Sequence, residues 1–235
     1  MDVTEAENFI NAQRKVGNKI TLTHLLAWLI GKTISEEIPE MNCFVRRGNV
    51  VKRKTVDANI SVLMPNNQMG SVLVKNIDTL NITDVAKIVN QKAIETRKGI
   101  EEGANSKKSL LAQIPWPFRK WFYTVIKRLI FDHGLNIPGV GIKDNAFGTF
   151  ILSNIGTLGL DVGFGALMPG SNLAIALFMG KVESKPVVIN DQIVIRRILA
   201  IGVTLDHRII DGQHGGKLFR GVKLRMKNLK NITNY

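Results

Sequence analysis

The sequence has one cysteine and no long apolar run, and these two absences narrow what the chain can be. Cys43 alone cannot form an intramolecular disulfide, and such sparse use of cysteine fits a reducing cytoplasm. No run of about 18 apolar residues is present, so no membrane-spanning helix is predicted. Residues 1–5 lack the basic-then-apolar order of a secretory signal. We therefore expect a single cytoplasmic globular domain over residues 1–235.

Recognisable metal, phosphate and cysteine-nucleophile motifs are also missing. His24, His133 and His214 do not have the spacing of metal ligands, and no Gly-rich phosphate loop occurs. Cys43 has no base among its near neighbours in the sequence, which favours a buried thiol over a nucleophile. We expect no metal cofactor.

Acidic residues are few, and the resulting positive charge suggests an anionic partner. The chain has 32 Lys and Arg residues against 19 Asp and Glu residues, a net charge of +13. A phosphate-bearing cofactor, nucleic acid, an anionic membrane surface or an acidic protein would each fit this charge. The excess positive charge is concentrated in three clusters: Arg46, Arg47, Lys52, Arg53 and Lys54; Arg119, Lys120, Lys127 and Arg128; and residues 217–230. Nucleic acid is disfavoured because no nucleic-acid motif is present and Phe219 is the only aromatic residue that lies among the basic residues of the first or third cluster.

The apolar periodicity predicts an α/β (α+β) domain in which a mixed sheet is flanked by helices. Asn190-Asp191 is typical of a hairpin turn, and Thr23 is the expected N-cap of the second helix. Helices are expected over 5–16, from Thr23 to before Pro39, within 78–103 and over 211–228. Strands are expected at 43–45, 50–51, 60–64, 72–74, 149–152, 173–179, 187–189, 193–195 and 200–205.

Residues 115–131 form an unusual amphipathic segment. Trp121 and Phe122 share a wide apolar face, and Arg119, Lys120, Lys127 and Arg128 lie largely on the other side. A buried core or subunit-interface helix would explain this pattern. A helix lying on a membrane surface or docked on a partner is the alternative, because basic residues with Trp and Phe suit that role.

His207 is the residue with the strongest chemical signal. It follows an apolar strand and precedes Asp211 and Gly212, which is an odd position for a core histidine. An imidazole held there by its own backbone would leave the other ring nitrogen free to accept a proton. On the residues alone, a general base and a structural histidine both remain open.

Two sequence blocks resemble the catalytic domains of the dihydrolipoamide acyltransferases of 2-oxoacid dehydrogenase complexes. The run GVTLDHRIIDGQHGGKL, residues 202–218, is similar to the DHRxxDG signature of that family. Residues 148–156, GTFILSNIG, resemble its G-T-F-T-I-S-N-x-G stretch and lie upstream at a family-like distance. Chloramphenicol acetyltransferases share the fold of this family.

The resemblance implies a chloramphenicol acetyltransferase-like trimer with its active site between subunits. It implies that His207 is the general base toward the thiol of coenzyme A or dihydrolipoamide, and that Ser153 donates to the oxyanion. Asp211 would be a structural carboxylate that holds the His loop and pairs with an arginine, for which Arg208 is a nearby candidate. Ser153 and His207 would then lie far apart in one chain.

The resemblance also implies departures and alternatives. The family's lipoyl domain and the arm before the catalytic part are not seen, so the domain is N-terminally short and a lipoyl group would come from a separate protein. An insertion is expected at about 105–141. The first basic cluster (Arg46, Arg47, Lys52, Arg53, Lys54) is a candidate site for the phosphates of coenzyme A. The alternatives are a catalytically quiet trimeric scaffold, in trimers or multiples of trimers, and an antibiotic acetyltransferase.

Overall fold

The computed structural model describes residues 1–63, 69–97, 118–134, 147–167 and 171–229. Its helices are α1 (Thr4–Lys15), α2 (Leu22–Glu37), α3 (Ile82–Arg97), α5 (Phe118–Lys127) and α6 (Gly212–Lys227). Short 3-10 turns cover Pro39–Met41 (η1) and Ile155–Leu158 (η3), and a π-helical turn covers Arg128–Asp132 (η2). The strands are β1 (Cys43–Arg46), β2 (Asn49–Lys52), β3 (Ala58–Leu63), β4 (Met69–Val74), β5 (Phe150–Asn154), β6 (Ile175–Ile189) and β7 (Gln192–Leu205).

Five of these strands form one mixed sheet in the order β4-β3-β5-β6-β7. The three central strands β3, β5 and β6 are parallel, whereas β4 and β7 run antiparallel at the two edges. β1 and β2, which match the strands expected at 43–45 and 50–51, form a separate hairpin. The predicted mixed sheet flanked by helices is therefore confirmed.

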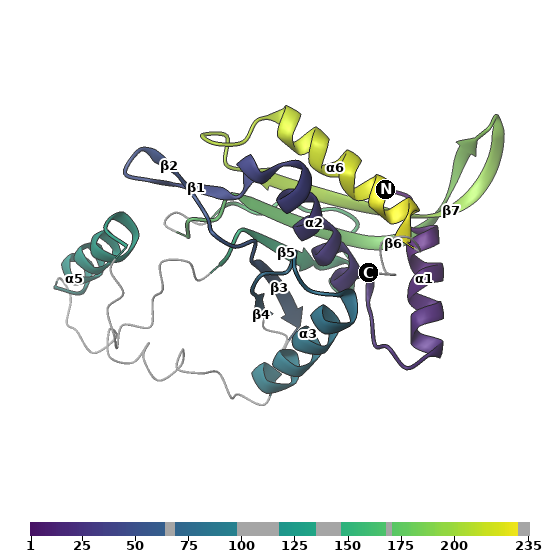
Figure 1. Ribbon diagram of the computed structural model, residues 1–235, viewed down its shortest axis with the longest axis horizontal. Coiled ribbons are helices and arrows are strands. Elements are labelled where there is room, and N and C mark those ends of the chain that lie inside the picture. Colours follow the sequence, from purple (N-terminus) through teal and green to yellow (C-terminus); the bar gives the residue numbers. More distant parts are fainter. Residues whose placement is uncertain (64–68, 98–117, 135–146, 168–170, 230–235) are drawn as a thin grey trace.

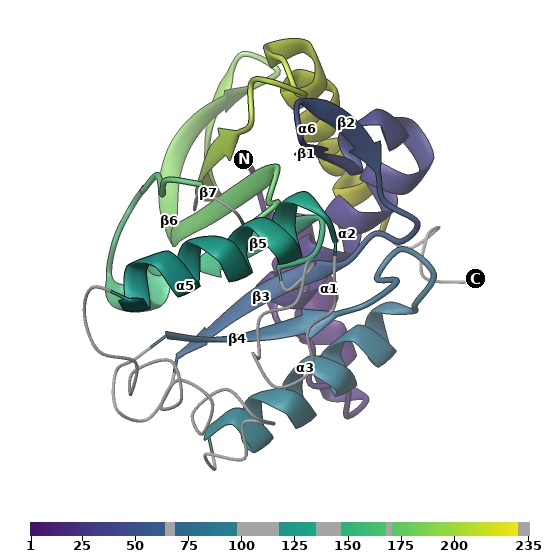
Figure 2. The same cartoon turned by 90° about the vertical axis from the view of Figure 1, so that its left-hand side faces the viewer.

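Helices α1, α2, α3 and α6 gather on one face of the sheet, and α5 lies apart from them at one end of the molecule (Figures 1 and 2). Alternate strand residues supply the core under these four helices. Phe150 and Leu152 of β5 and Ile175 and Leu177 of β6 are fully buried in it. Because side chains alternate along a strand, Ile151 and Ser153 must lie on the opposite face. The sheet thus separates the main core from the surface that carries Ser153.

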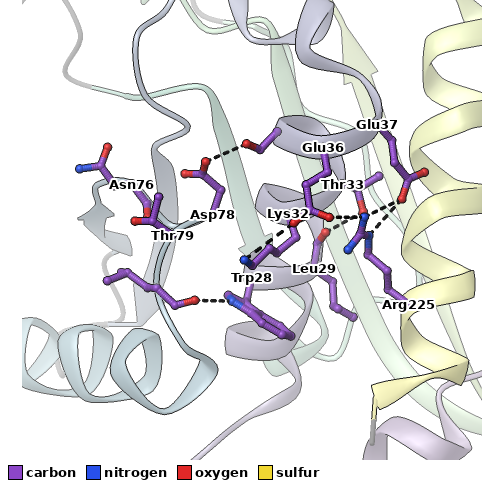
Figure 3. Close-up of polar contacts among 12 residues, drawn as sticks. Trp28, Leu29, Lys32, Thr33, Glu36, Glu37, Asn76, Asp78, Thr79 and Arg225 are labelled. Atoms are coloured by element: carbon purple, nitrogen blue, oxygen red, sulfur yellow. Dashed lines mark hydrogen bonds and ion pairs between the residues drawn. The ribbon is translucent and has the colours of Figure 1, made fainter. Parts of the chain in front are cut away.

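Helix α2 anchors this core from its first turn to its last. Its N-cap is Thr21, whose hydroxyl accepts from the backbone N–H of His24 at 3.3 Å. Thr23 was the expected cap and this was wrong: it lies inside the first turn, where its hydroxyl accepts from Asn154 Nδ2 at 3.1 Å. Trp28 donates to the carbonyl of Leu80 at 2.8 Å. Figure 3 shows the ion pairs of Arg225 with Glu36 and Glu37 that join α6 to α2. The Arg225 guanidinium bridges Glu36 and Glu37, each at 2.8 Å, so α6 is fixed against α2 at its far end.

β6 and β7 are much longer than the four short strands expected from the sequence, and that expectation was wrong. Their polar middle residues lie where the β6–β7 hairpin extends beyond the rest of the sheet (Figure 1). Neither face of the hairpin has to be apolar at that point. The predicted turn is confirmed, with Asn190 and Asp191 at φ 51° and 59°. The projecting arm exposes Val188, Ile193 and Ile195 by 69%, 78% and 77%.

A segment of residues 159–165 lies directly on the sheet face opposite the helices. A Cβ at Gly180 would be 1.7 Å from the carbonyl oxygen of Asp161, and one at Gly202 would be 2.0 Å from that of Gly163. Only glycine allows this approach. The segment therefore covers part of β6 and β7 on the face that carries Ser153.

The predicted amphipathic helix is present as α5 and continues into η2. Phe118 and Trp121 are 65% and 67% exposed, whereas Ile130 is fully buried. Residues 115–117 and most of the expected insertion lie outside the described residues. Within the described ranges, no helix combines the length and the apolar character needed to cross a bilayer.

Candidate functional site

The loop that follows β7 presents His207 to solvent between two fixed ends. The N–H of Asp206 donates to the carbonyl of Ala174 at 2.9 Å, and the N–H groups of Ile209 and Ile210 return to the carbonyl of Asp206 at 3.0 and 2.9 Å. Ile210 is buried in the core at 1% exposure. His207 itself is exposed, and its ring makes no hydrogen bond with any described residue. The expected orientation of the ring by its own backbone is therefore not seen.

Asp211 closes this loop by capping α6. Its carboxylate accepts from the backbone N–H of His214 at 3.0 Å and contacts the imidazole Nδ1 of the same residue at 2.6 Å. This backbone hydrogen bond is the main reason why the pKa of Asp211 is lowered. Arg208, the candidate partner for Asp211, instead pairs with Asp206 at 2.6 Å. Hydrogen bonding from Arg208 lowers the pKa of Asp206.

Ser153 lies near the end of β5 on the face opposite the helices. It is 8% exposed, and its hydroxyl makes no hydrogen bond among the described residues. The backbone pairs it with Phe178 on β6, which in turn pairs with Gly202 on β7. The strand backbone thus positions Ser153, whose hydroxyl donor is unused among the described residues.

The strand register separates Ser153 from His207 within one chain. Ser153 is level with Gly202, so Leu205 is two strands across, about 10 Å, and three residues along, about another 10 Å. His207 follows Leu205 by two residues, in the loop beyond the strand end. A direct hydrogen bond between the two side chains inside one chain is therefore ruled out, as expected.

The first basic cluster lies on and just after the β1–β2 hairpin, at the same end of the molecule as the His207 loop (Figures 1 and 2). The guanidinium groups of Arg46 and Arg53 lie 5.0 and 4.7 Å from the centre of the Phe44 ring. Arg53 also donates to the carbonyl of Asn172. These two arginines therefore interact with other groups of the protein.

The other members of the cluster differ in their engagement. Arg47 contacts the imidazole of His133, next to η2. Lys52 and Lys54 are exposed and make no ion pair among the described residues. Of the five predicted phosphate ligands, these two lysines are the most accessible for an anion.

The weaker candidates behave as structural groups. Cys43 is buried, its thiol lies 2.9 Å from the carbonyl oxygen of Glu40, and burial raises its pKa. His24 is buried as part of the α2 cap, and burial lowers its pKa to about 4. In the described ranges, no group of three or more His, Cys, Asp and Glu residues could hold a metal ion.

Sequence reasoning missed a polar group on the Ser153 face of β3. Asn59 is 2% exposed, and its side-chain oxygen is fully buried without a partner in the described part of the chain. Ser61 follows on the same face of β3 and pairs across the strands with Ser71. The alternation of Ala58, Asn59, Ile60 and Ser61 could have indicated a strand with an apolar face toward the core and a polar face on the opposite side.

The C-terminal part of the chain matches a known enzyme family. Residues 140–233 match the family model of the 2-oxoacid dehydrogenases acyltransferase (catalytic domain). The acetyltransferase component of the Acholeplasma laidlawii pyruvate dehydrogenase complex is 36% identical over 89 residues, which is 38% of this chain and 16% of that protein. The mitochondrial succinyltransferase component of the Bos taurus 2-oxoglutarate dehydrogenase complex is 23% identical over 195 residues, 82% of this chain and 34% of that protein. The chain thus spans about a third or less of the length of these relatives.

Solved structures share the fold over nearly the whole chain. A probable dihydrolipoamide acetyltransferase from Listeria monocytogenes matches with TM-score 0.71 and 18% identity, over 97% of this chain and 81% of that one. A study of a serine, a histidine and an asparagine in the catalytic mechanism of the Azotobacter vinelandii dihydrolipoamide acetyltransferase gave a structure that matches with TM-score 0.69 and 17% identity, over 98% and 80%. A chloramphenicol acetyltransferase matches with TM-score 0.52 and 16% identity, over 96% and 84%. The predicted chloramphenicol acetyltransferase-like fold is confirmed.

Proposed function

Since residues 140–233 match the family model of the 2-oxoacid dehydrogenases acyltransferase (catalytic domain), we propose that the chain transfers acyl groups between coenzyme A and a dihydrolipoamide-type thiol. The observation that carries this proposal is the exposed imidazole of His207 on a loop anchored at both ends. A base in this position has no competing partner among the described residues. A free thiol with a pKa near about 8.5 is mostly protonated at neutral pH, so it needs such a base.

The reaction divides between the two residues. His207 takes the proton of the attacking thiol as its sulfur bonds to the thioester carbonyl carbon. The carbonyl oxygen becomes an oxyanion, to which the Ser153 hydroxyl donates. When the tetrahedral intermediate collapses, the C–S bond to the first thiol breaks, and that thiolate takes the proton back from the imidazolium.

Release of thiol from acyl-CoA tests this proposal. His207→Ala should lose roughly 10²–10⁴-fold in kcat, and Ser153→Ala roughly 10²–10³-fold. Gln213→Ala, an exposed position in the first turn of α6, is the matched control and should keep wild-type activity. Unchanged thiol release in His207→Ala would exclude this mechanism, whereas a wild type that releases no thiol would favour a trimeric scaffold of the same fold. Two acceptors should be compared in this assay. One is dihydrolipoamide, which a separate lipoyl protein would carry, and the other is chloramphenicol.

The separation of Ser153 from His207 favours a site completed by two subunits of a trimer. Co-expression of Ser153→Ala with His207→Ala tests this, since each variant alone is inactive. In randomly mixed trimers about a quarter of the sites would combine an intact histidine with an intact serine, so about a quarter of wild-type activity should return. Without recovery, the two residues do not act in one shared site.

Lys52 and Lys54 are the proposed contacts for the coenzyme A phosphates. Replacing both with Ala should raise KM for coenzyme A, and the difference from wild type should shrink as salt screens the charges. A KM that stays at the wild-type value would place the phosphates elsewhere. The single buried cysteine supports a cytoplasmic location as part of the same proposal.

A further inference from the structure

The amide of Asn59 is buried on the sheet face that carries Ser153, yet it makes no hydrogen bond with any described residue. The atom that is fully buried without a partner is the oxygen Oδ1. The nitrogen Nδ2 also has no partner but is not among the fully buried atoms, so it is the end of the amide that a substrate can meet. A leucine of similar shape would avoid the cost of burying an unpaired carbonyl. The polar side chain at this position therefore has another purpose.

The register brings this amide close to Ser153. β3 and β5 are parallel, and Asn59 is paired with Ile151. Ser153 follows Ile151 by two residues, so it lies on the same face and diagonally across from Asn59. Diagonal neighbours of this kind are about 7–8 Å apart at Cα and somewhat closer at Cβ.

One oxygen atom placed between these two side chains can accept from both. A serine Oγ lies about 1.4 Å and an asparagine Nδ2 about 2.5 Å from its Cβ, and each hydrogen bond adds about 2.8–2.9 Å. Two such donors reach a common acceptor when their Cβ atoms are up to about 9 Å apart. The Asn59–Ser153 spacing falls inside this limit.

We propose that Asn59 Nδ2 is a second donor to the oxyanion that forms beside Ser153; this rests on the proposed acyl transfer. When the thiolate sulfur bonds to the thioester carbon, the carbonyl electron pair moves to oxygen, and Asn59 Nδ2–H and Ser153 Oγ–H donate to it together. On collapse the C=O bond re-forms and the C–S bond to the first thiol breaks. Asn59 moves no proton, because its task is to hold a donor where negative charge develops.

Two substitutions of Asn59 remove the donor without changing the size of the side chain much. In Asn59→Leu and Asn59→Asp, kcat for thiol release from acyl-CoA should fall roughly 10²-fold. KM for the acyl donor should stay within about twofold, since the oxyanion exists only in the transition state. Asn90→Leu and Asn90→Asp are matched controls on α3, where the exposed amide donates to the carbonyl of Lys19, and should keep wild-type kcat.

Two further readouts separate a donor from a structural role. If Asn59 and Ser153 serve the same oxyanion, the double variant with Ser153→Ala should lose less than the product of the two single losses. A protonated carboxyl can donate where leucine cannot, so the ratio of kcat in Asn59→Asp to kcat in Asn59→Leu should rise as pH falls. His207 is present in both variants, so its own titration cancels in this ratio.

Several results would overturn the inference. Wild-type kcat in a folded Asn59→Leu, as judged by circular dichroism, would do so, and so would a kcat loss that is independent of Ser153 and of pH. A loss confined to Ser61→Ala would assign the second donor to Ser61, which follows Ile60, the partner of Leu152, on β3. If Asn59→Leu does not fold, the ratio of kcat in Asn59→Asp to kcat in the wild type, which also contains His207 and should rise as pH falls, decides the question. A wild type that releases no thiol removes the proposed function as well, whereas activity lost in His207→Ala but kept in Asn59→Leu removes this inference alone.

Discussion

A methyl group at position 202 would collide with the segment of residues 159–165 that lies on the sheet. The Cβ of Gly202→Ala would be 2.0 Å from the carbonyl oxygen of Gly163, and ordinary van der Waals contact begins at 3.4 Å. The segment would have to move away from the strand by more than 1 Å. Overpacking of this kind costs about 1–3 kcal/mol.

Gly216 provides a control of the opposite sign. It is exposed within α6, and a Cβ there meets nothing within 4 Å. Alanine in a helix interior is about 0.5–1 kcal/mol more favourable than glycine, so Gly216→Ala should stabilise the protein. The two variants should therefore differ by about 2–4 kcal/mol. In a domain of this size 1 kcal/mol shifts Tm by about 2–4 °C, so their Tm values should differ by roughly 4–15 °C.

Thermal unfolding followed by circular dichroism measures this difference. All three proteins must be compared at equal concentration, because association would otherwise change the apparent Tm. Limited proteolysis adds a local readout, since the displaced segment should be cut faster in Gly202→Ala than in Gly216→Ala. A Gly202→Ala protein that melts at or above the wild-type Tm would mean that residues 159–165 do not lie on β7.

Three further outcomes are expected. In Thr149→Val the hydroxyl that accepts from the Asp57 N–H at 3.1 Å and donates to Asn42 Oδ1 at 2.8 Å is lost, so two buried groups lose a partner and chemical denaturation should show a loss of at least about 1–3 kcal/mol. Burial lowers the pKa of His24 to about 4 from 6.5, so stability should fall by about 3 kcal/mol as pH falls from 6.5 to 4, because only the unfolded chain takes up the proton. His24→Gln keeps a capping side chain and should flatten this pH dependence. If urea unfolding shows that the free energy of unfolding changes equally with pH in His24→Gln and in the wild type, His24 is not the group responsible. Trp121→Ala should weaken any salt-sensitive binding of the protein to anionic vesicles, and no binding by the wild type would leave α5 as a subunit or partner surface.

The sequence predicts the elements whose periodicity matches their burial. Helix α6 begins one residue after the expected start because Asp211 is its N-cap, and α1 ends before Gly17, whose φ of 90° suits glycine. The error at Thr23 arose because two threonines lie close together and only the fold decides which one caps α2. The β6–β7 arm was divided into short strands because its middle is polar on both faces.

Only those site residues that lie in a local sequence motif could be predicted. His207 and Ser153 each lie in a recognisable block, and the structure fixes their distance from each other. Asn59 has no such block, and its value comes from lying diagonally opposite a serine some 90 residues later in the chain. The difference in the roles of Arg53 and Lys52 likewise depends on a contact with Asn172, which no local pattern indicates.

The projecting arm also means that one strand has two local stabilities. In β6, Ile175–Met179 is paired with strands on both sides, whereas Lys185–Ile189 is paired with β7 alone, beyond the point where residues 1–3 hydrogen-bond to β7 at Arg197 and Leu199. A two-stranded ribbon without a third strand or a packed face is only marginally stable in water. In a separate chain, backbone amide hydrogens of the outer part should therefore exchange with deuterium far faster than those of the inner part. Slow exchange in the outer part would mean that another molecule covers the arm. Hydrogen exchange would therefore report assembly without a probe attached to the protein.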